Sequence, residues 1–182
     1  MCRLFIVLAA ITFAVSSCTS KSGSASNTDT AQAVAANTGP NTDMREKNKT
    51  TALAADEAVN NHDAEALFKD ATPDFTDYSD GSMPPVEGKD SCKAFFQQFL
   101  TAFPDMKGEN LMAIADGNHV AVFGDWSGTF KGKIMGMKPT NKSFKIKDVD
   151  LFTFNDQGQI TEHRSIQPMT TIMMQVGASM KK

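Results

Sequence analysis

The chain has 182 residues, of which 41% are hydrophobic, and a formal net charge of −3 at neutral pH. This length is enough for one ordinary globular domain with additional segments at its ends. The small and mixed charge excludes the basic stripe with interleaved aromatic residues that is typical of nucleic-acid-binding proteins, so no nucleic acid partner is expected.

The N-terminal residues are typical of an export signal. Arg3 precedes an apolar run over residues 4–15, which has signal-peptide length and is too short to span a bilayer. The run leads directly to Cys18 in a pattern that resembles the bacterial lipobox, which implies cleavage before Cys18 and its acylation. An ordinary secretory signal with an incidental cysteine is the alternative. We expect residues 1–17 to be a lipoprotein signal peptide, and acylated Cys18 to anchor the protein in the bacterial cell envelope, on the periplasmic side or in the outer membrane.

Residues 18–44 are rich in Ser, Thr, Ala, Asn and Gly and show no apolar periodicity. Such a composition predicts a disordered tether. After processing, Cys92 is the only remaining thiol, so no intramolecular disulfide is expected. Cys92 lies near the start of an apolar helix and is expected to be a small buried hydrophobe. A folded domain over residues 45–178 and a short tail over 179–182 complete the predicted organisation.

The predicted elements of the domain begin with helices. A first helix ends at Asn60, Asp63 caps a second short helix, and a strand follows over residues 73–78. A third, apolar helix ends before Pro104, which lacks a donor and clashes with the preceding turn. Strands joined by short turns and one glycine-rich connection are then predicted over residues 107–116, 119–130, 143–155 and 159–167. This order predicts an α+β fold, with the helices packed on one face of a curved sheet.

An ordered series of short motifs resembles the SnoaL-like branch of the nuclear transport factor 2-like superfamily. The motifs are Phe103-Pro104-Asp105, Gly128-Thr129, Pro139-Thr140, Gly158-x-Ile160 and Gln175-Val176-Gly177. The resemblance covers about residues 44–178. It implies a cone-shaped α+β barrel with a mostly antiparallel sheet, a short C-terminal helix and a pocket for a small molecule. It also implies a homodimer, which is frequent in this superfamily.

The sequence departs from the pattern of its relatives at four positions. Phe130 stands where the family has His, and Arg164 stands where it has Trp. The last-strand acids of the family, one of which serves as acid and base in ring closure, fall on Ser165 and Pro168. Whether the chain is an enzyme is therefore left open.

Three residues are candidate catalytic bases: Asp125, Asp150 and His163. Asp125 lies beside Trp126 on a predicted strand, but either face of that strand can be the inner one. Asp150 follows Asp148 at period two between aromatic residues, which is consistent with a general acid/base pair in the pocket. The alternative is a solvated stretch, with the core-facing set switched by a bulge, and this is the reading we expect because the alternation is broken there. His163 has an unperturbed pKa near neutrality and is a candidate replacement for the missing acid.

Six residues are candidates for contact with a ligand: Tyr78, Phe99, Phe123, Trp126, Met135 and Phe152. No metal site and no cofactor are expected, because the three histidines lie on different elements without a ligand motif. The methionine-rich segments are expected to provide adaptable apolar packing.

These observations support three functional hypotheses. The leading one is a membrane-tethered domain that binds a small, largely apolar molecule, with catalysis lost or altered. The second is a cyclase- or isomerase-type enzyme with a pocket Asp or His as base. The third is a homodimeric interaction module without a ligand. An enclosed pocket that contains an Asp or His near a Tyr or Trp favours the enzyme.

Overall fold

The computed structural model describes residues 40–178. The predicted signal peptide, most of the predicted tether with Cys18, and the tail over residues 179–182 lie outside these residues. The first helix, α1 (Pro40–Asn60), begins a few residues before the predicted domain boundary. Within residues 40–178, no helix combines the length and apolar composition needed to cross a membrane.

The other helices agree closely with the predictions. In α2 (Ala64–Leu67), the Asp63 side chain accepts a hydrogen bond from the backbone N–H of Ala66 at 3.0 Å, which is the predicted N-cap. Helix α3 spans Lys89–Ala102 and ends before Pro104. A short helix α4 (Met169–Gln175) closes the described chain.

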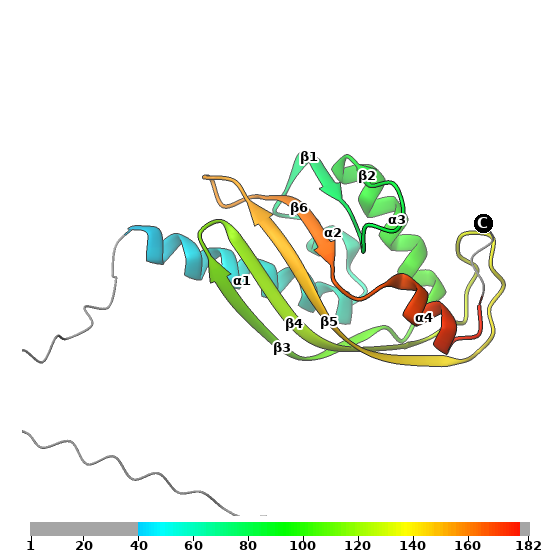
Figure 1. Cartoon of the computed structure of the whole chain (residues 1–182). Coiled ribbons are helices and arrows are strands. Elements are labelled where there is room, and N and C mark those ends of the chain that lie inside the picture. The colour runs from blue at the N-terminus through cyan, green and yellow to red at the C-terminus, as the bar shows by residue number, and fades with distance from the viewer. Residues whose placement is uncertain (1–39, 179–182) are drawn as a thin grey trace, which may run out of the picture. The chain divides into compact units, whose positions relative to one another are not determined.

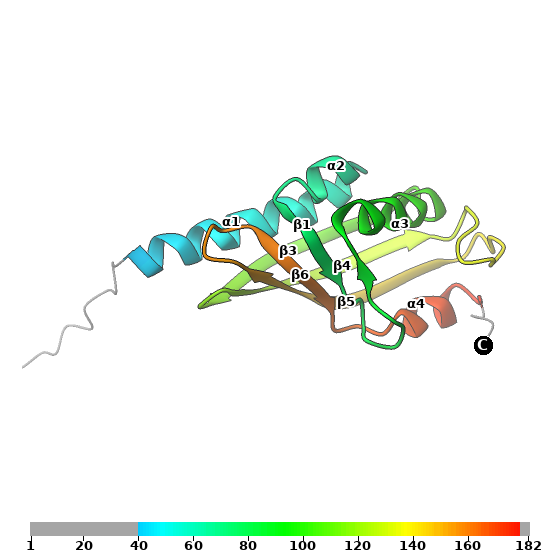
Figure 2. The ribbon, with the colours of Figure 1, turned by 90° about the horizontal axis from the view of Figure 1, so that it is seen from above.

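One six-stranded sheet forms the other layer. Its strands are β1 (Ala71–Asp77), β2 (Val86–Glu87), β3 (Lys107–Asp116), β4 (His119–Thr129), β5 (Ser143–Phe154) and β6 (Ile160–Ser165). The order in the sheet is β2-β1-β6-β5-β4-β3, and only β1 and β6 pair in parallel. Helices α1, α2 and α3 lie along one face of the curved sheet (Figures 1 and 2). The predicted α+β architecture is confirmed, and β2 is the element that the sequence did not indicate.

The face of β4 that looks inward is set by its register with β3 and β5. Val120, Val122 and Trp126 are buried, whereas Phe123 is exposed on the outer face with Asp125 beside it. The strand pairs with β5 without a shift from His119 to Thr129. Side chains therefore alternate strictly between the two faces along the whole strand.

The same register corrects the interpretation of β5. No bulge interrupts the pairing of β5 with β4, so alternate residues of β5 stay on the same face of the sheet along the whole strand. The face that carries Phe144, Ile146, Phe152 and Phe154 points into the core. Asp148 and Asp150 belong to this set. The expected switch to a solvated stretch was wrong, and both carboxyl groups face the interior of the domain.

One departure from the expected family pattern, Phe130, is a packing feature. Phe130 is fully buried, and its ring stacks on Phe103 with centroids 5.3 Å apart. Phe103 also contacts Phe144 edge to face at 5.5 Å. An apolar ring at position 130 thus extends an aromatic cluster at the end of the sheet near α4. Cys92 is buried as predicted, and its thiol lies 3.2 Å from the carbonyl oxygen of Val86.

Candidate functional site

A cavity of about 150 Å³ lies between the helices and the inner face of the sheet. Most of its walls are apolar. Seven aromatic side chains contribute: Phe68, Phe75, Phe95, Phe96, Phe99, Trp126 and Phe152. Helices α1 and α3 cover the cavity on one side, and the inner faces of β1, β4, β5 and β6 form the other. An apolar pocket with a few polar groups is the usual form of a small-molecule site.

Trp126 reaches the cavity because two glycines leave room for its ring. A Cβ at Gly108, its register partner on β3, would lie 2.7 Å from the indole. A Cβ at Gly124 would lie 2.9 Å from the indole Nε1. Both distances are too short for a real contact, so a side chain at either position would displace Trp126 from the cavity wall.

His163 forms the centre of the polar wall. Its Nδ1 lies 3.1 Å from Oδ1 of Asp77, and its Nε2 lies 3.2 Å from Oδ1 of Asp150. Its ring also packs against Phe152, with centroids 5.1 Å apart. Three strands meet here: Asp77 is the register partner of His163 on β1, and Asp150 comes from β5 on the other side.

The two carboxylates determine the charge of the imidazole. Burial by itself disfavours the imidazolium, but the hydrogen bonds and charges of Asp150 and Asp77 outweigh it and raise the pKa of His163 well above its usual 6.5. Burial is the largest single effect on Asp77 and opposes its ionisation, but the hydrogen bond to His163, the charge of His163 and the backbone N–H of Ser79 together outweigh it and lower the pKa of Asp77. His163 is therefore an imidazolium that donates to both neighbours at neutral pH.

Asp56 is a fourth polar group of this wall and comes from α1. Its side chain is 4% exposed, and within the described residues its Oδ2 has no hydrogen-bond partner. Burial first, and then the negative charge of Asp150, raise its pKa well above the usual value. The carboxyl group therefore keeps its proton to a higher pH than an exposed Asp.

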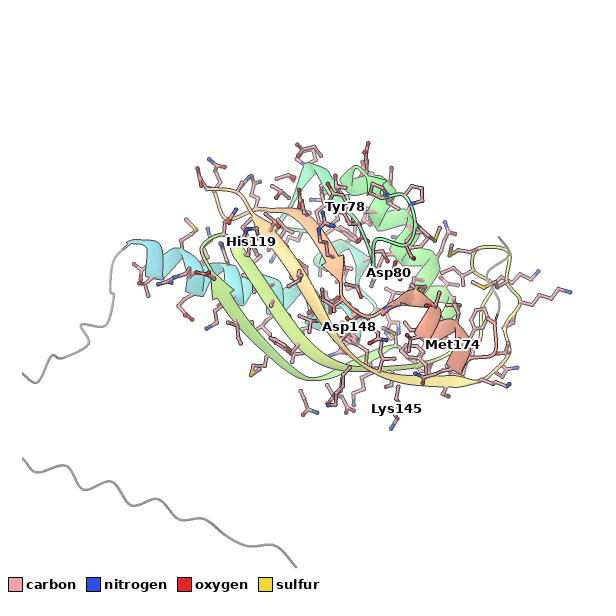
Figure 3. All side chains as sticks on the ribbon, viewed as in Figure 1. Tyr78, Asp80, His119, Lys145, Asp148 and Met174 are labelled. Carbon is pink, nitrogen blue, oxygen red and sulfur yellow. The ribbon has the colours of Figure 1, made fainter. Side chains whose placement is uncertain are left out.

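Asp148 occupies the end of the cavity near α4 (Figure 3). Its Oδ2 accepts a hydrogen bond from Oγ of Ser165 at 2.6 Å, and its Oδ1 accepts one from the backbone N–H of Gln167 at 2.7 Å. Burial and the charge of Asp150 raise the pKa of Asp148. Ser165, at a position where the resemblance leads us to expect an acid, thus serves as a donor to a carboxylate on the neighbouring strand.

The structure brings some of the predicted site residues together. Asp150 and His163 are hydrogen-bonded to each other, and Phe99, Trp126 and Phe152 line the same cavity. Asp56 and Asp77 were missed by sequence reasoning. Asp56 had a detectable signal, because it follows Ala52 and Ala55 and precedes Val59 on the buried stripe of its helix.

Four other candidates lie elsewhere. Asp125 is on the outer face of the sheet, where it pairs with Lys147 at 2.6 Å and accepts a hydrogen bond from Asn110 at 2.7 Å. Phe123 shares that outer face because of the β4 register. Met135 is exposed in the connection between β4 and β5, and Tyr78 lies under the Arg164 guanidinium, 3.8 Å from the ring centroid. None of the four belongs to the cavity lining.

Fold and site together define an α+β domain with an acidic and aromatic pocket. The sequence profile of the SnoaL-like polyketide cyclase family matches residues 49–176, and the chain belongs to this family. No curated protein matches the chain.

Solved structures agree with this assignment. AclR from Streptomyces galilaeus, a proposed hydroxylase, is 26% identical with a TM-score of 0.62, covering 73% of this chain and 97% of its own. A proposed SnoaL-like polyketide cyclase from Jannaschia sp. CCS1 is 25% identical with a TM-score of 0.65, covering 75% and 95%. A protein from Catenulispora acidiphila with a ketosteroid isomerase-like fold, 17% identical with a TM-score of 0.54, covers 71% and 94% and shows the fold alone.

Proposed function

We propose that this domain is an acid–base enzyme of cyclase or isomerase type, which moves a proton on a small, largely apolar molecule held in the cavity. The observation that carries the proposal is the position of His163 between Asp77 and Asp150 at the wall of an aromatic cavity. A cavity that only held an apolar ligand would not need this set of ionisable groups, because buried charges are costly. The enzyme hypothesis therefore takes precedence over passive binding.

Asp150 is the base in this proposal. Its Oδ1 is held by His163, and within the described residues its Oδ2 has no hydrogen-bond partner, so Oδ2 is available to a ligand. His163 cannot be the base itself, since both ring nitrogens donate to carboxylates. It acts as a positioning residue that orients Asp150, and Asp77 orients His163 in turn. A base held in this way by a second and third group is a recurring catalytic arrangement.

The size of the cavity limits the substrate. About 150 Å³ is comparable to an engineered apolar cavity that accepts benzene. The part of a substrate that is enclosed is thus about one ring in size, and a larger polyketide-like molecule would have to extend out of the cavity. We infer a ring-sized carbonyl compound as the simplest substrate.

Proton transfer can be tested with two probes. One is the base-promoted ring opening of 5-nitrobenzisoxazole, and the other is solvent deuterium uptake next to the carbonyl of ring-sized diketones, followed by NMR. The variant Asp150→Asn is expected to lose at least about 100-fold in rate. Asp125→Asn, a carboxyl group on the outer face, is the matched control and should keep the rate. Equal rates for the protein and Asp150→Asn would favour a binding module instead.

We further propose that the domain is anchored to the cell envelope by acylated Cys18 and that it forms a homodimer. The first rests on the sequence before Cys18. The second is supported by the apolar outer face of the sheet, where Met112, Ile114 and Phe123 are exposed.

A further inference from the structure

The cavity contains more negative than positive groups. Among residues 40–178, its lining includes four carboxyl groups, from Asp56, Asp77, Asp148 and Asp150, and no Lys or Arg. His163 is the only cation that the described part of the chain contributes to the lining, and its two N–H groups are already used by Asp77 and Asp150. If Asp56 keeps its proton, three carboxylates still face one imidazolium. Buried charges are stable only when they are paired, so this wall lacks at least one positive group.

Asp56 is the residue beside which we expect the positive group of a ligand to bind. It is 4% exposed, it lines the cavity, and its Oδ2 is unpartnered within the described residues. Ser165 and Gln167 are neutral donors to the two oxygens of Asp148, and His163 donates to Oδ1 of Asp77 and to Oδ1 of Asp150. In addition to Oδ2 of Asp150, the buried Oδ2 of Asp56 is therefore an acceptor that a bound molecule would complete.

The opposite walls suit the same kind of molecule. Aromatic side chains from α3, including Phe96 and Phe99 with ring centroids 5.9 Å apart, lie across the cavity from the sheet, where Trp126 contributes its indole. Aromatic rings attract cations electrostatically and form the usual cages for ammonium groups. They also exclude water, which strengthens a charge pair with a carboxylate.

We propose that this cavity binds a small organic cation, an ammonium or quaternary ammonium compound of about one-ring size, with Asp56 as its counter-ion. On binding, Asp56 releases its proton to solvent, and the resulting carboxylate pairs with the cation against the aromatic wall. The inference narrows the substrate of the proposed acid–base site to a ring-sized molecule whose otherwise apolar body carries an ammonium group, and it rests on the proposed function only in using the same cavity.

The test uses isothermal titration calorimetry of the full chain with matched pairs of probes. Choline is compared with 3,3-dimethyl-1-butanol, its uncharged isostere, and benzylamine is compared with benzyl alcohol. The cation of each pair is expected to bind at least about tenfold more tightly. Titrations of choline in two buffers with different ionisation enthalpies should reveal proton release. Equal or tighter binding of the uncharged probes, cation binding without proton release, or failure of both cations to bind would overturn the proposal.

Variants assign the effect to Asp56. Asp56→Asn should weaken choline by about tenfold and abolish proton release, while leaving 3,3-dimethyl-1-butanol unchanged. Asp125→Asn, whose carboxyl group lies on the outer face of the sheet, is the control and should bind choline normally. Carboxyl NMR of the unmodified chain gives a second measurement that needs no variant, because choline should lower the pKa of Asp56. An unchanged Asp56 titration with choline bound would contradict the counter-ion role.

The outcomes separate this inference from the proposed function. Proton transfer that depends on Asp150, without preference for cations, would reject the cationic ligand and leave the acid–base enzyme intact. Tight cation binding with Asp56 proton release, but without proton transfer by the protein, would reject the catalysis and leave the ligand class intact.

Discussion

Asp77 and His163 are 86 residues apart in the chain, yet they are direct register partners on the parallel pair of β1 and β6, with Oδ1 and Nδ1 3.1 Å apart. This pairing joins β1, the first strand in the sequence, to β6, the last strand in the sequence. On the other side of β6, β5 brings Asp150 to Nε2 of the same ring. The contacts of His163 with Asp77 and Asp150 therefore exist only when β1, β6 and β5 are paired.

Replacement of His163 is expected to destabilise the domain in a pH-dependent way. The folded-state pKa of His163 is raised by Asp150 and Asp77 against the effect of burial. Protonated His163 therefore stabilises the folded state fully at pH values below its unfolded pKa of about 6.5. This stabilisation is lost as the pH rises through its higher pKa in the folded state. His163→Asn should lower the free energy of unfolding by about 3 kcal/mol at mildly acidic pH. Urea denaturation at several pH values checks this, and a constant difference up to strongly alkaline pH would contradict it.

Asp56→Asn is expected to stabilise the empty domain. The pKa of Asp56 is raised in the folded state, so its protonated carboxyl group favours the folded state. This stabilisation is complete below the ordinary pKa of 3.8 and is lost as the pH rises through the pKa of Asp56 in the folded state. A neutral amide avoids that loss. We expect a gain of about 1 kcal/mol in unfolding free energy at neutral pH and little difference at strongly acidic pH. Thermal or urea denaturation at both pH values measures it, and lower stability of the variant at neutral pH would count against a buried, unpaired carboxyl group.

Restoring the family's acid at position 165 is expected to be harmful. Ser165→Asp replaces a hydroxyl that donates to Asp148 with a second carboxylate at the same place. Like charges at this distance repel, so unfolding free energy should fall by about 1–3 kcal/mol at neutral pH. Adding Asp148→Asn should recover most of the loss, since an amide can donate to the new carboxylate. Ser165→Ala is the control and should lose only about 1 kcal/mol.

The outer face of the sheet is expected to carry the homodimer contact. Met112 and Phe123 are register partners there, and Ile114 is 55% exposed on the same face. Exposed apolar side chains that are grouped in this way are typical of protein interfaces. The double variant Ile114→Lys with Phe123→Lys should sediment as a monomer while keeping the thermal stability of the domain. A dimer of unchanged affinity would place the contact elsewhere.

Cys18→Ser should release the protein from the membrane fraction. A protein held by two or three acyl chains stays with the membrane, because each buried methylene contributes about 0.8 kcal/mol. Cell fractionation and mass spectrometry of the N-terminal peptide check the prediction, and Cys92→Ser is the matched control. Cys92 is buried in the domain, and its substitution should leave the location unchanged. An unmodified Cys18 in the membrane-bound protein would contradict acylation.

The fold and part of the site could be predicted from local patterns. The Asp63 cap, the end of α3 before Pro104 and the turns between strands follow from the short-range preferences of the residues themselves. Asp150, His163, Phe99, Trp126 and Phe152 were recognised as candidates by residue type and periodicity. Asp125 and Phe123 were also recognised in this way and lie on the outer face, because alternation identifies two sets of residues without saying which one faces inward.

The sequence by itself determined the order of elements, the family and the chemical types of residue available to the pocket. These depend on local periodicity, on turn residues and on motifs within short segments. Only the tertiary structure decided the face of each strand, the inward position of Asp148 and Asp150, the role of buried Asp56 on α1, and the contact of Asp77 with His163. Each of these depends on pairing between distant strands or on packing of a helix against the sheet. The local pattern shows at most that a residue such as Asp56 is on a buried stripe, and it does not show which distant partner that residue meets.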